Sequence, residues 1–488
     1  MEVTVRDIMA SLEKYIPSPK SNVNFSQSTS GKNSEATVIE PKKKYCVGET
    51  LSVLVQMRDH RFYLKTYGGD FITARIYSSN LKAAVSGVVE DLQNGTYRIN
   101  FKLFWPGKVT IHLLLIHSSE AISALWRTRQ QDYDKILFTG VFINGTKRET
   151  SPCRFVKSPN TTVCSYGDER DGERFYCLKT HSLPCEALYE MVTGYNQTRL
   201  FSTEENKMLQ RCAETHLQCT FVVFLPTDTF PETLEKCQFG MSSPFPSGYF
   251  FQNKWFSSYC HTENFLSPDS ITGCLRDKSL HFRGDSTSRQ WIEYLVAKIK
   301  DLKYTIPMDG NVPRLAISSN HNFSVQWKKH AHPWMTGTPQ PLHYASYIAR
   351  DLDSIAGGEN TVIMISVGQH LRAFPIQLFI NRIISIRRGI ERLLQRSPLT
   401  KVFIKNENTR NIWEYINVYN NWHGHLNNLA QKEVFKGLEV GFVDAWDMTI
   451  ASNEFAVHPA EMVISNQVAI FLSYLCPSQP ASPIPFQW

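Results

Sequence analysis

A serine that could act as a nucleophile lies in the segment Gly284-Asp285-Ser286. The segment joins a short apolar run at 280–283 to a helical pattern that extends from 287 to about 302. A serine at such a turn projects from the carboxyl edge of a sheet, and its backbone N–H can join the helix N-terminus in stabilising an oxyanion. The same tripeptide also forms ordinary turns and helix caps, so taken alone it fits either interpretation.

A hydroxyl nucleophile needs a general base and groups that stabilise negative charge. His458, followed by Pro459, is the candidate base, and the alternative is a histidine packed in a loop. Gly368, Gln369 and His370 come directly after a buried strand and are candidates for an oxyanion hole; the alternative is a plain strand-to-helix turn. All these candidates fall at strand ends, which favours one shared site.

The elements that would position these residues form an α/β domain at 276–476. Continuous β-branched runs alternate there with helical patterns, which is typical of a parallel sheet covered on both faces. We expect strands at 280–283, 360–367, 400–405 and 440–444, with helices at 287–302 and 376–395.

The N-terminal half has a different pattern. Residues 41–145 contain short alternating apolar runs separated by turn signals, which predicts an antiparallel β-sandwich. Residues 1–40 are polar and are interpreted as a stem or flexible lead-in, and 146–275 as a cysteine-rich connector held by disulfides. The Pro-rich tail at 477–488 is expected to be disordered.

Cysteine usage indicates an oxidising compartment. The chain has eleven cysteines, irregularly spaced and without C-x-x-C pairs, so disulfides are favoured over a zinc site. The odd count leaves one thiol free or paired with another chain. Six glycosylation sequons point to the same compartment, at Asn24, Asn94, Asn144, Asn160, Asn196 and Asn322.

No targeting segment is visible to match this prediction. Residues 1–8 lack an apolar core, and no stretch approaches the length of ~20 apolar residues that spans a membrane. Either the targeting segment is missing from this product, which we favour, or the chain is a cytosolic variant of a secreted design. We therefore expect the Golgi lumen or secretion. The net charge of +7 comes without a Lys/Arg run, so nucleic acid is not an expected partner.

Several longer strings resemble one known family. Segments 67–71, 94–97 and 103–107 resemble a neurexophilin-like, immunoglobulin-type sandwich. Segment 284–291 resembles the nucleophile block of a PC-esterase domain, and segments 368–370 and 444–459 resemble other parts of that domain. The chain thus resembles the neurexophilin and PC-esterase domain family across nearly its whole length.

The resemblance implies a C-terminal domain similar to SGNH/GDSL hydrolases, which use a Ser–His–Asp triad. It would make Ser286 the acylated nucleophile and His458 its base, with the N–H groups of Ser286 and Gly368, and Gln369 or His370, forming the oxyanion hole. The pattern departs in two places. A Gly-x-Asn donor is replaced by Gly368-Gln369-His370, and the acid of a D-x-x-H motif is replaced by Phe455.

Three acids could substitute for the missing one in orienting His458. They are Glu454, one residue further back, and Asp444 or Asp447 from the preceding strand end.

Relatives with this layout act on carbohydrate, so the resemblance implies an O-acetyltransferase or O-acetylesterase for a glycan or glycoprotein, with sialic acid as one candidate. Acetyl-CoA would be the donor in a transferase, although the sequence shows no phosphate-cradling glycine loop. Arg289 could pair with a substrate carboxylate or form a helix-surface salt bridge. The alternative function is a secreted binding protein, whose sandwich engages a cell-surface partner while the esterase-like domain is inert.

Other residues rank lower. His423 and His425 would share a face of a strand, but without a nearby acid or cysteine we expect no metal site. Four tryptophans could stack on sugars or pack in the core, namely Trp291, Trp327, Trp334 and Trp446.

Overall fold

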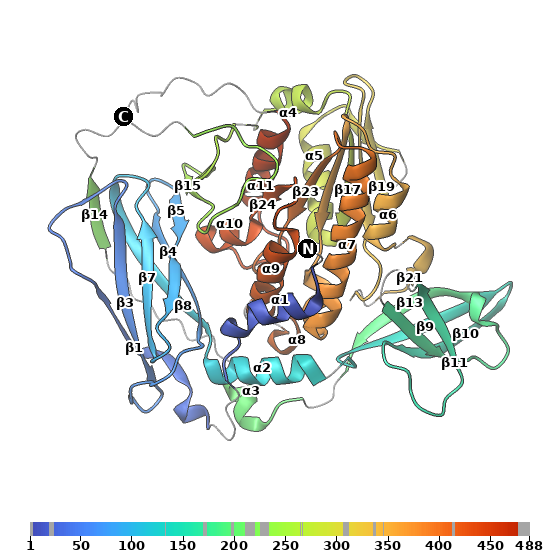
Figure 1. Ribbon diagram of the computed structural model, residues 1–488, viewed down its shortest axis with the longest axis horizontal. Helices are drawn as coiled ribbons and strands as arrows, with labels where there is room; N and C mark the ends of the chain where they lie inside the picture. The colour runs from blue at the N-terminus through green and yellow to red at the C-terminus, as the bar shows by residue number, and fades with distance from the viewer. Residues whose placement is uncertain are drawn as a thin grey trace.

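The structure is a computed structural model. It describes residues 3–18, 24–131, 133–168, 173–196, 200–209, 220–224, 234–263, 265, 267–305, 312–334, 338–344, 346–411 and 415–476. A β-sandwich and a disulfide-linked β-sheet lie at opposite ends of the molecule, and an α/β domain lies between them (Figure 1). The tail predicted to be disordered, 477–488, lies outside the described residues.

Two sheets that share one hydrophobic cluster form the sandwich. The first sheet has the order β1 (Thr29–Val38), β3 (Thr50–Asp59), β7 (Thr96–Lys102) and β6 (Val88–Asp91). The second has the order β16 (Lys254–Ser257), β15 (Gly248–Phe251), β5 (Ala83–Ser86), β4 (Phe71–Ser78), β8 (Gly107–His117), β14 (Thr220–Phe224) and β2 (Tyr45–Cys46). Alternate residues such as Val53 and Ile111 point into the cluster, as the alternating pattern predicted.

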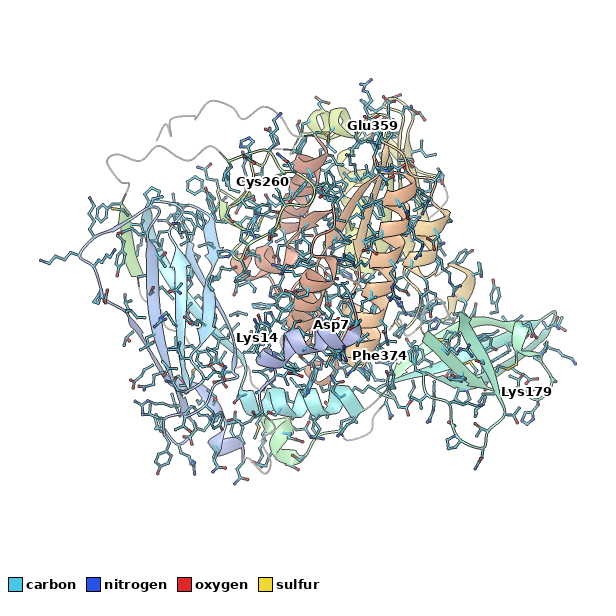
Figure 2. The ribbon with its side chains drawn as sticks, viewed as in Figure 1. Asp7, Lys14, Lys179, Cys260, Glu359 and Phe374 are labelled. Carbon is cyan, nitrogen blue, oxygen red and sulfur yellow. A yellow bond between two sulfur atoms is a disulfide. The ribbon has the colours of Figure 1, made fainter. Side chains whose placement is uncertain are left out.

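The interpretation of residues 1–40 as a flexible lead-in was wrong. They contain α1 (Val5–Leu12), short 3-10 turns η1 (Glu13–Tyr15) and η2 (Phe25–Gln27), and the edge strand β1. Ile8 and Leu12 are one turn apart on α1 and are buried against the α/β domain, while β1 pairs with β3 and stays polar on its exposed side. Figure 2 labels Asp7 in the first turn of α1 and Lys14 just beyond its end.

The cysteine-rich region is a sheet rather than an irregular connector. After α2 (Ser119–Gln131) comes an antiparallel sheet of β11 (Val163–Asp168), β12 (Glu173–Leu178), β10 (Lys147–Arg154), β9 (Ile136–Asn144), β13 (Leu188–Tyr195) and β21 (Gln340–Pro341). Because β9 begins at 136, and β14 to β16 return to the sandwich, both boundaries expected at 145 and 275 differ from the structure. The sheet was not predicted from the sequence because its strands are short and rich in polar residues, so they show no clear alternation of apolar and polar positions. The short helical element η4 (Cys185–Ala187) lies between β12 and β13, and α3 (Thr203–Leu209) follows β13.

The predicted disulfides are present. Cys153–Cys177 and Cys164–Cys185 lie in this sheet, Cys237–Cys260 encloses β15 and β16, and Cys274–Cys476 joins α4 (Pro268–Leu275) to the end of the last helix. Cys46 has no disulfide partner in the described part of the chain, and Cys212 and Cys219 lie outside it.

The α/β domain contains a seven-stranded sheet. Its order is β18 (Leu302–Tyr304), β19 (Arg314–Ser318), β20 (Phe323–Lys329), β17 (Ser279–Gly284), β22 (Thr361–Ser366), β23 (Lys401–Lys405) and β24 (Gly441–Val443). Five neighbouring strands run parallel, which confirms the predicted parallel sheet; they are β20, β17, β22, β23 and β24. β18 and β19 add an antiparallel edge.

Helices cover both faces of this sheet. α5 (Ser286–Lys298) and α11 (Glu461–Leu475) pack with Leu280 and Phe282 on one face. The other face packs against α6 (Ile348–Ser354), α7 (Ile376–Arg396) and α9 (Asn421–Phe435). The remaining elements are η5 (Leu342–Tyr344), η6 (Gln369–Ala373), α8 (Ile416–Tyr419) and α10 (Ala445–Ser452). None of the helices in the described residues combines the length and apolar character needed to cross a bilayer.

Candidate active site

The turn that carries Ser286 can form only with glycine at 284. Gly284 ends β17 with a φ of 155°, and a Cβ there would lie 1.9 Å from the carbonyl oxygen of Ser366 on β22. Ser286 is the first residue of α5, so its N–H is one of the free amides at a helix N-terminus. The predicted strand–turn–helix placement of the serine is therefore confirmed.

Asp285 stabilises this turn through hydrogen bonds. Its side chain is buried, and its carboxylate accepts hydrogen bonds from the Thr287 N–H at 2.9 Å and the Thr287 hydroxyl at 2.7 Å. Its carbonyl oxygen accepts bonds from Ser288 Oγ at 2.7 Å and from Trp327 Nε1 at 3.3 Å. Asp285 is thus the N-cap of α5, and it fixes the direction in which Ser286 leaves the strand.

His458 contacts the serine directly. Its Nε2 lies 2.7 Å from Ser286 Oγ, although the two residues are 172 positions apart in the chain. Burial of part of the ring lowers the pKa of His458 below its ordinary value of 6.5, and Arg289 lowers that pKa further while Asp285 opposes the shift. The imidazole is therefore neutral at neutral pH, and its Nε2 can accept the serine proton.

None of the three acids considered as orienters is bonded to this histidine. Glu454 accepts the N–H of Ala456 at 3.0 Å. Asp444 caps α10 and pairs with Lys432 at 2.8 Å, and Asp447 accepts the N–H of Ser247 at 2.5 Å. Within the described residues, no hydrogen bond reaches His458 Nδ1. The described site is thus a Ser–His dyad rather than a triad.

Asp444 and Asp447 have structural tasks that the sequence did not reveal. Asp444 also accepts a bond from Asn406 Nδ2 at 2.8 Å, which ties α10 to the loop after β23. Asp447, with Ser247, ties α10 to the segment before β15 of the sandwich.

The two backbone amides proposed for an oxyanion hole lie at one edge of the sheet. β17 and β22 pair side by side up to Gly284 and Ser366, and the N–H of Asp285 bonds the Ser366 carbonyl at 3.2 Å. Gly368 follows two residues later with a φ of 151°. Among the described residues, neither the Ser286 N–H nor the Gly368 N–H is used in another hydrogen bond, so both can serve a substrate oxygen.

The side chains of Gln369 and His370 are already engaged. Gln369 Nε2 donates to the carbonyl of Asn408 at 3.0 Å. His330 Nδ1 lies 2.6 Å from the Ala331 carbonyl, which can only accept, so His330 Nε2 must accept from His370 Nδ1 at 2.9 Å. Burial lowers the pKa of both histidines well below 6.5. Neutral His370 therefore has no proton left on Nε2, which argues against it as an oxyanion donor.

His330 was missed in the sequence, although the alternation from Phe323 to Lys329 could have indicated a strand that ends beside it.

Arg289 forms the helix-surface ion pair that was one of its two expected roles. Its Nε lies 3.1 Å from Glu293 Oε1, and Arg314 contacts the same oxygen at 2.5 Å. The Arg289 guanidinium also lies 5.7 Å from the ring centroid of Trp327. Its positive charge lowers the pKa of His458, after the larger effect of burial.

The lower-ranked candidates are placed in the core. Trp291, Trp327, Trp334 and Trp446 are at most 5% exposed, so their rings pack rather than face sugars. His423 and His425 lie on helix α9, not on a strand, because this segment is capped by Asn420. No cluster of metal-ligating side chains occurs in the described ranges. Five of the sequon asparagines are exposed, while Asn196 is half-buried and bonds the Asp134 carbonyl at 3.0 Å.

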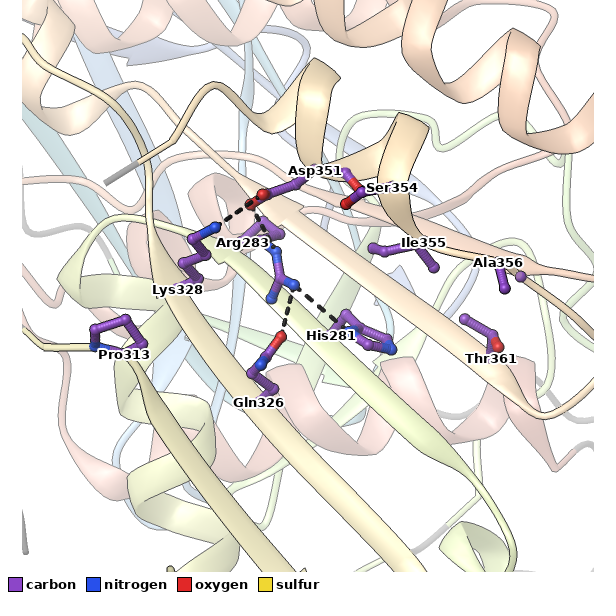
Figure 3. Close-up of a pocket in the computed structure, with 11 residues that line it drawn as sticks. His281, Arg283, Pro313, Gln326, Lys328, Asp351, Ser354, Ile355, Ala356 and Thr361 are labelled. Atoms are coloured by element: carbon purple, nitrogen blue, oxygen red, sulfur yellow. Dashed lines mark hydrogen bonds and ion pairs between the residues drawn. The ribbon is translucent and has the colours of Figure 1, made fainter. Parts of the chain in front are cut away.

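A separate cavity of about 590 Å³ lies beside β17 and β20 and does not include the dyad. Figure 3 shows Arg283 at its centre, between Asp351 and Gln326. Arg283 and Lys328 both contact Asp351, at 3.1 and 2.9 Å. The cavity's charged groups thus already pair with one another.

Comparison with solved structures gives low similarity. A family two carbohydrate esterase from Clostridium thermocellum in complex with cellohexaose is 10% identical and has a TM-score of 0.22, with 90% of this chain and 96% of that chain covered. The Lin-41 filamin domain is 22% identical with a TM-score of 0.16, and covers 18% of this chain and 82% of its own. TM-scores this low do not indicate a shared overall fold.

Family models match both halves of the chain. The neurexophilin model matches residues 6–209, which include α1, the first strands of the sandwich and most of the disulfide-linked sheet. The model described as the C-terminal domain of proteins like NXPE family member 4 matches residues 255–476, which include Ser286 and His458. The chain therefore belongs to the neurexophilin and PC-esterase domain family.

Proposed function

We propose that this protein is a serine-dependent O-acyltransferase or esterase that adds an acetyl group to a glycan hydroxyl or removes one. The observation that carries the proposal is the 2.7 Å contact between His458 Nε2 and Ser286 Oγ at the carboxyl edge of the parallel sheet. A neutral histidine beside the hydroxyl is the arrangement that nucleophilic acyl transfer requires. Membership of a family with an esterase-type domain supports the same reaction class.

In the first half-reaction, Ser286 Oγ attacks the carbonyl carbon of the acyl donor while its proton moves to His458 Nε2. The carbonyl electron pair moves onto oxygen, where the N–H groups of Ser286 and Gly368 and the N-terminus of α5 stabilise the charge. When the intermediate collapses, the leaving group departs with the proton from His458 Nε2, and an acyl-serine remains.

The second half-reaction decides between transfer and hydrolysis. His458 accepts a proton from a glycan hydroxyl or from water, and that oxygen attacks the acyl-serine carbon. The product leaves as an acetylated glycan or as acetate, and Ser286 regains its proton from His458. In the transfer direction acetyl-CoA is the proposed donor, and no metal is needed in either direction.

Arg289 supports a glycan that carries a carboxylate, such as sialic acid. Its positive charge lowers the pKa of His458, but its guanidinium already pairs with Glu293. A substrate carboxylate would have to share that cation, and Arg314 would then balance the charge of Glu293.

We place the reaction in the secretory pathway, where four disulfides and glycosylation of the exposed sequons are compatible with the surroundings.

One observation favours the rival function, a secreted binding protein with an inert esterase-like domain. His458 lacks an acid partner in the described structure, and loss of an orienter can lower the rate by about 10⁴-fold. In this case the sandwich would be the functional half and would bind a cell-surface protein.

A fluorophosphonate probe and a cell assay separate the two functions. The probe should label the folded wild-type protein, and Ser286→Ala should lose both labelling and acetylation of a sialoglycan in cells by at least ~10³-fold. Ser79→Ala, in an exposed turn of the sandwich, is the control and should behave as wild type. Absence of labelling in folded wild type would favour the binding protein, and acetylation that survives in Ser286→Ala would end the proposal.

A further inference from the structure

A chain of buried polar side chains runs from the N-terminal half of the protein to the loop that carries Gly368. Arg129, on α2, donates from Nη2 to Asn427 Oδ1 at 2.8 Å. Asn427, on α9, donates from Nδ2 to Glu407 Oε1 at 2.9 Å. The three side chains are at most 2% exposed, so solvent does not replace these bonds.

Glu407 lies directly against the proposed oxyanion glycine. A Cβ at Gly368 would be 2.2 Å from Glu407 Oε1, the same oxygen that Asn427 holds. The other carboxylate oxygen accepts a bond from Arg372 Nε at 2.6 Å, and Arg372 belongs to η6, the short helix that directly follows Gly368. The position of the Glu407 carboxylate therefore sets the space in which Gly368 lies.

Arg129 also holds the far end of the same loop. Its Nε donates to the carbonyl oxygen of Phe374 at 2.9 Å, and Phe374 is the residue that ends η6 (labelled in Figure 2). At the near end, Gln431 on α9 donates to the carbonyl of Val367 at 2.9 Å. One guanidinium thus fixes the end of the loop directly and its beginning through Asn427 and Glu407.

We propose that Arg129 is a positioning residue for acyl transfer, which keeps the Gly368 N–H aimed at the oxyanion. The proposal rests on the proposed function, because it concerns the geometry of that reaction. It makes the half matched by the neurexophilin model a working part of the esterase-like site, although no residue of that half touches the substrate. A donor held slightly out of place stabilises the transition state less, while substrate binding is retained.

The test compares Arg129→Met with Arg127→Met in the full-length protein. Arg127 lies on the same helix, but it is nearly half exposed and pairs with Glu205, so it controls for loss of a positive charge on α2. Arg129→Met should slow fluorophosphonate labelling of Ser286 by about tenfold or more with little change in probe binding. Amide hydrogen exchange should become faster at 367–374 and stay unchanged at 284–287, whereas Arg127→Met should change neither.

A second variant covers the case in which Arg129→Met fails to fold. Asn427→Leu interrupts the same chain without removing a charge, and it should give the same pattern of exchange and labelling. If both variants fold, the double variant should label no more than about threefold slower than either single variant, because both act on one unit.

Unchanged exchange at 367–374 in a folded variant would overturn the proposal, even if the thermal midpoint fell, because that result describes stability alone. Labelling that slows only as the folded fraction decreases would also overturn it. The exchange measurement does not require activity. It therefore gives an answer even if folded wild type is not labelled, the result that counts against the proposed function itself.

Discussion

The two members of the proposed catalytic dyad, Ser286 and His458, are held to very different degrees. Ser286 follows a glycine whose backbone leaves no room for a Cβ. It also follows a buried aspartate whose oxygens accept bonds from the side chains of Thr287, Ser288 and Trp327. His458 lies in an exposed part of the loop between α10 and α11, and in the described structure its ring bonds only to Ser286. The core thus fixes the proposed nucleophile in place, whereas the proposed base is held mainly through its backbone.

Few contacts fix the loop that carries the base. Gln290 Nε2 donates to the Pro459 carbonyl at 3.3 Å, and Thr409 Oγ1 donates to the Glu454 carbonyl at 2.5 Å. These bonds set the path of the chain but leave rotation of the imidazole free. Substitutions at the turn around Ser286 should therefore affect folding and activity together, while substitutions of His458 should affect activity alone.

The largest effect is expected for Gly284→Ala, which tests the rigid side. The new Cβ would collide with the Ser366 carbonyl at a φ that alanine rarely adopts, and we expect a loss of about 3 kcal/mol or more of stability. Gly273→Ala is the matched control, because its Cβ would lie in open space on helix α4 and should stabilise by about 0.5–1 kcal/mol. Thermal unfolding measures both, and equal midpoints would contradict the assigned turn.

Replacement of the base should leave the fold intact. His458→Ala should reduce the labelling rate of Ser286 by about 10²–10⁴-fold, the usual contribution of a general base, with an unchanged thermal midpoint. Since His458 is partly open to solvent, added imidazole should restore part of the rate. His321→Ala, a half-buried histidine paired with Asp301 far from the site in sequence, serves as the control for loss of an imidazole. Full activity without His458 would remove it from the mechanism.

The environment of the base predicts a pH profile. Only neutral His458 can accept the serine proton, and burial and then Arg289 lower its pKa, so the rate should rise with pH and level off with a midpoint below 6.5. Arg289→Gln removes a repulsive cation, which favours the protonated ring and should move this midpoint upward. Arg392→Gln, which breaks an exposed ion pair with Asp353, should not move it. A downward shift in Arg289→Gln would contradict the assigned electrostatics.

The same contrast explains what could be predicted from the sequence. The nucleophile turn is local, since its strand, glycine, cap and helix follow one another within a few residues. The parallel sheet was likewise visible in runs of β-branched residues, and both predictions are confirmed. His458 was proposed as the base because a serine nucleophile needs one, but no local pattern in the sequence indicates that it lies beside Ser286.

Residues that act through distant contacts could not be predicted in this way. The tasks of Asp444 and Asp447 depend on Lys432, Asn406 and Ser247, and the last is about 200 positions away. The edge strand within 1–40 was not predicted, because a polar composition indicates that side chains are exposed but does not indicate whether the backbone pairs with another strand. Arg129 gave no signal, since its partners belong to another half of the chain.

A weak effect is expected for Glu454→Gln, which tests whether this acid acts on His458. Glu454 is the acid nearest to the missing D-x-x-H position, yet its carboxylate accepts the Ala456 N–H, a bond that a glutamine oxygen can also accept. Labelling should therefore remain within about threefold of wild type. A true orienting acid gives a different result, because its amide replacement lowers the rate by about 10⁴-fold. If Glu454→Gln caused a loss of that size, the loop would have to rearrange on substrate binding and bring Glu454 to His458 Nδ1. The measured rate thus distinguishes a dyad that works without an acid from a triad that forms only with substrate.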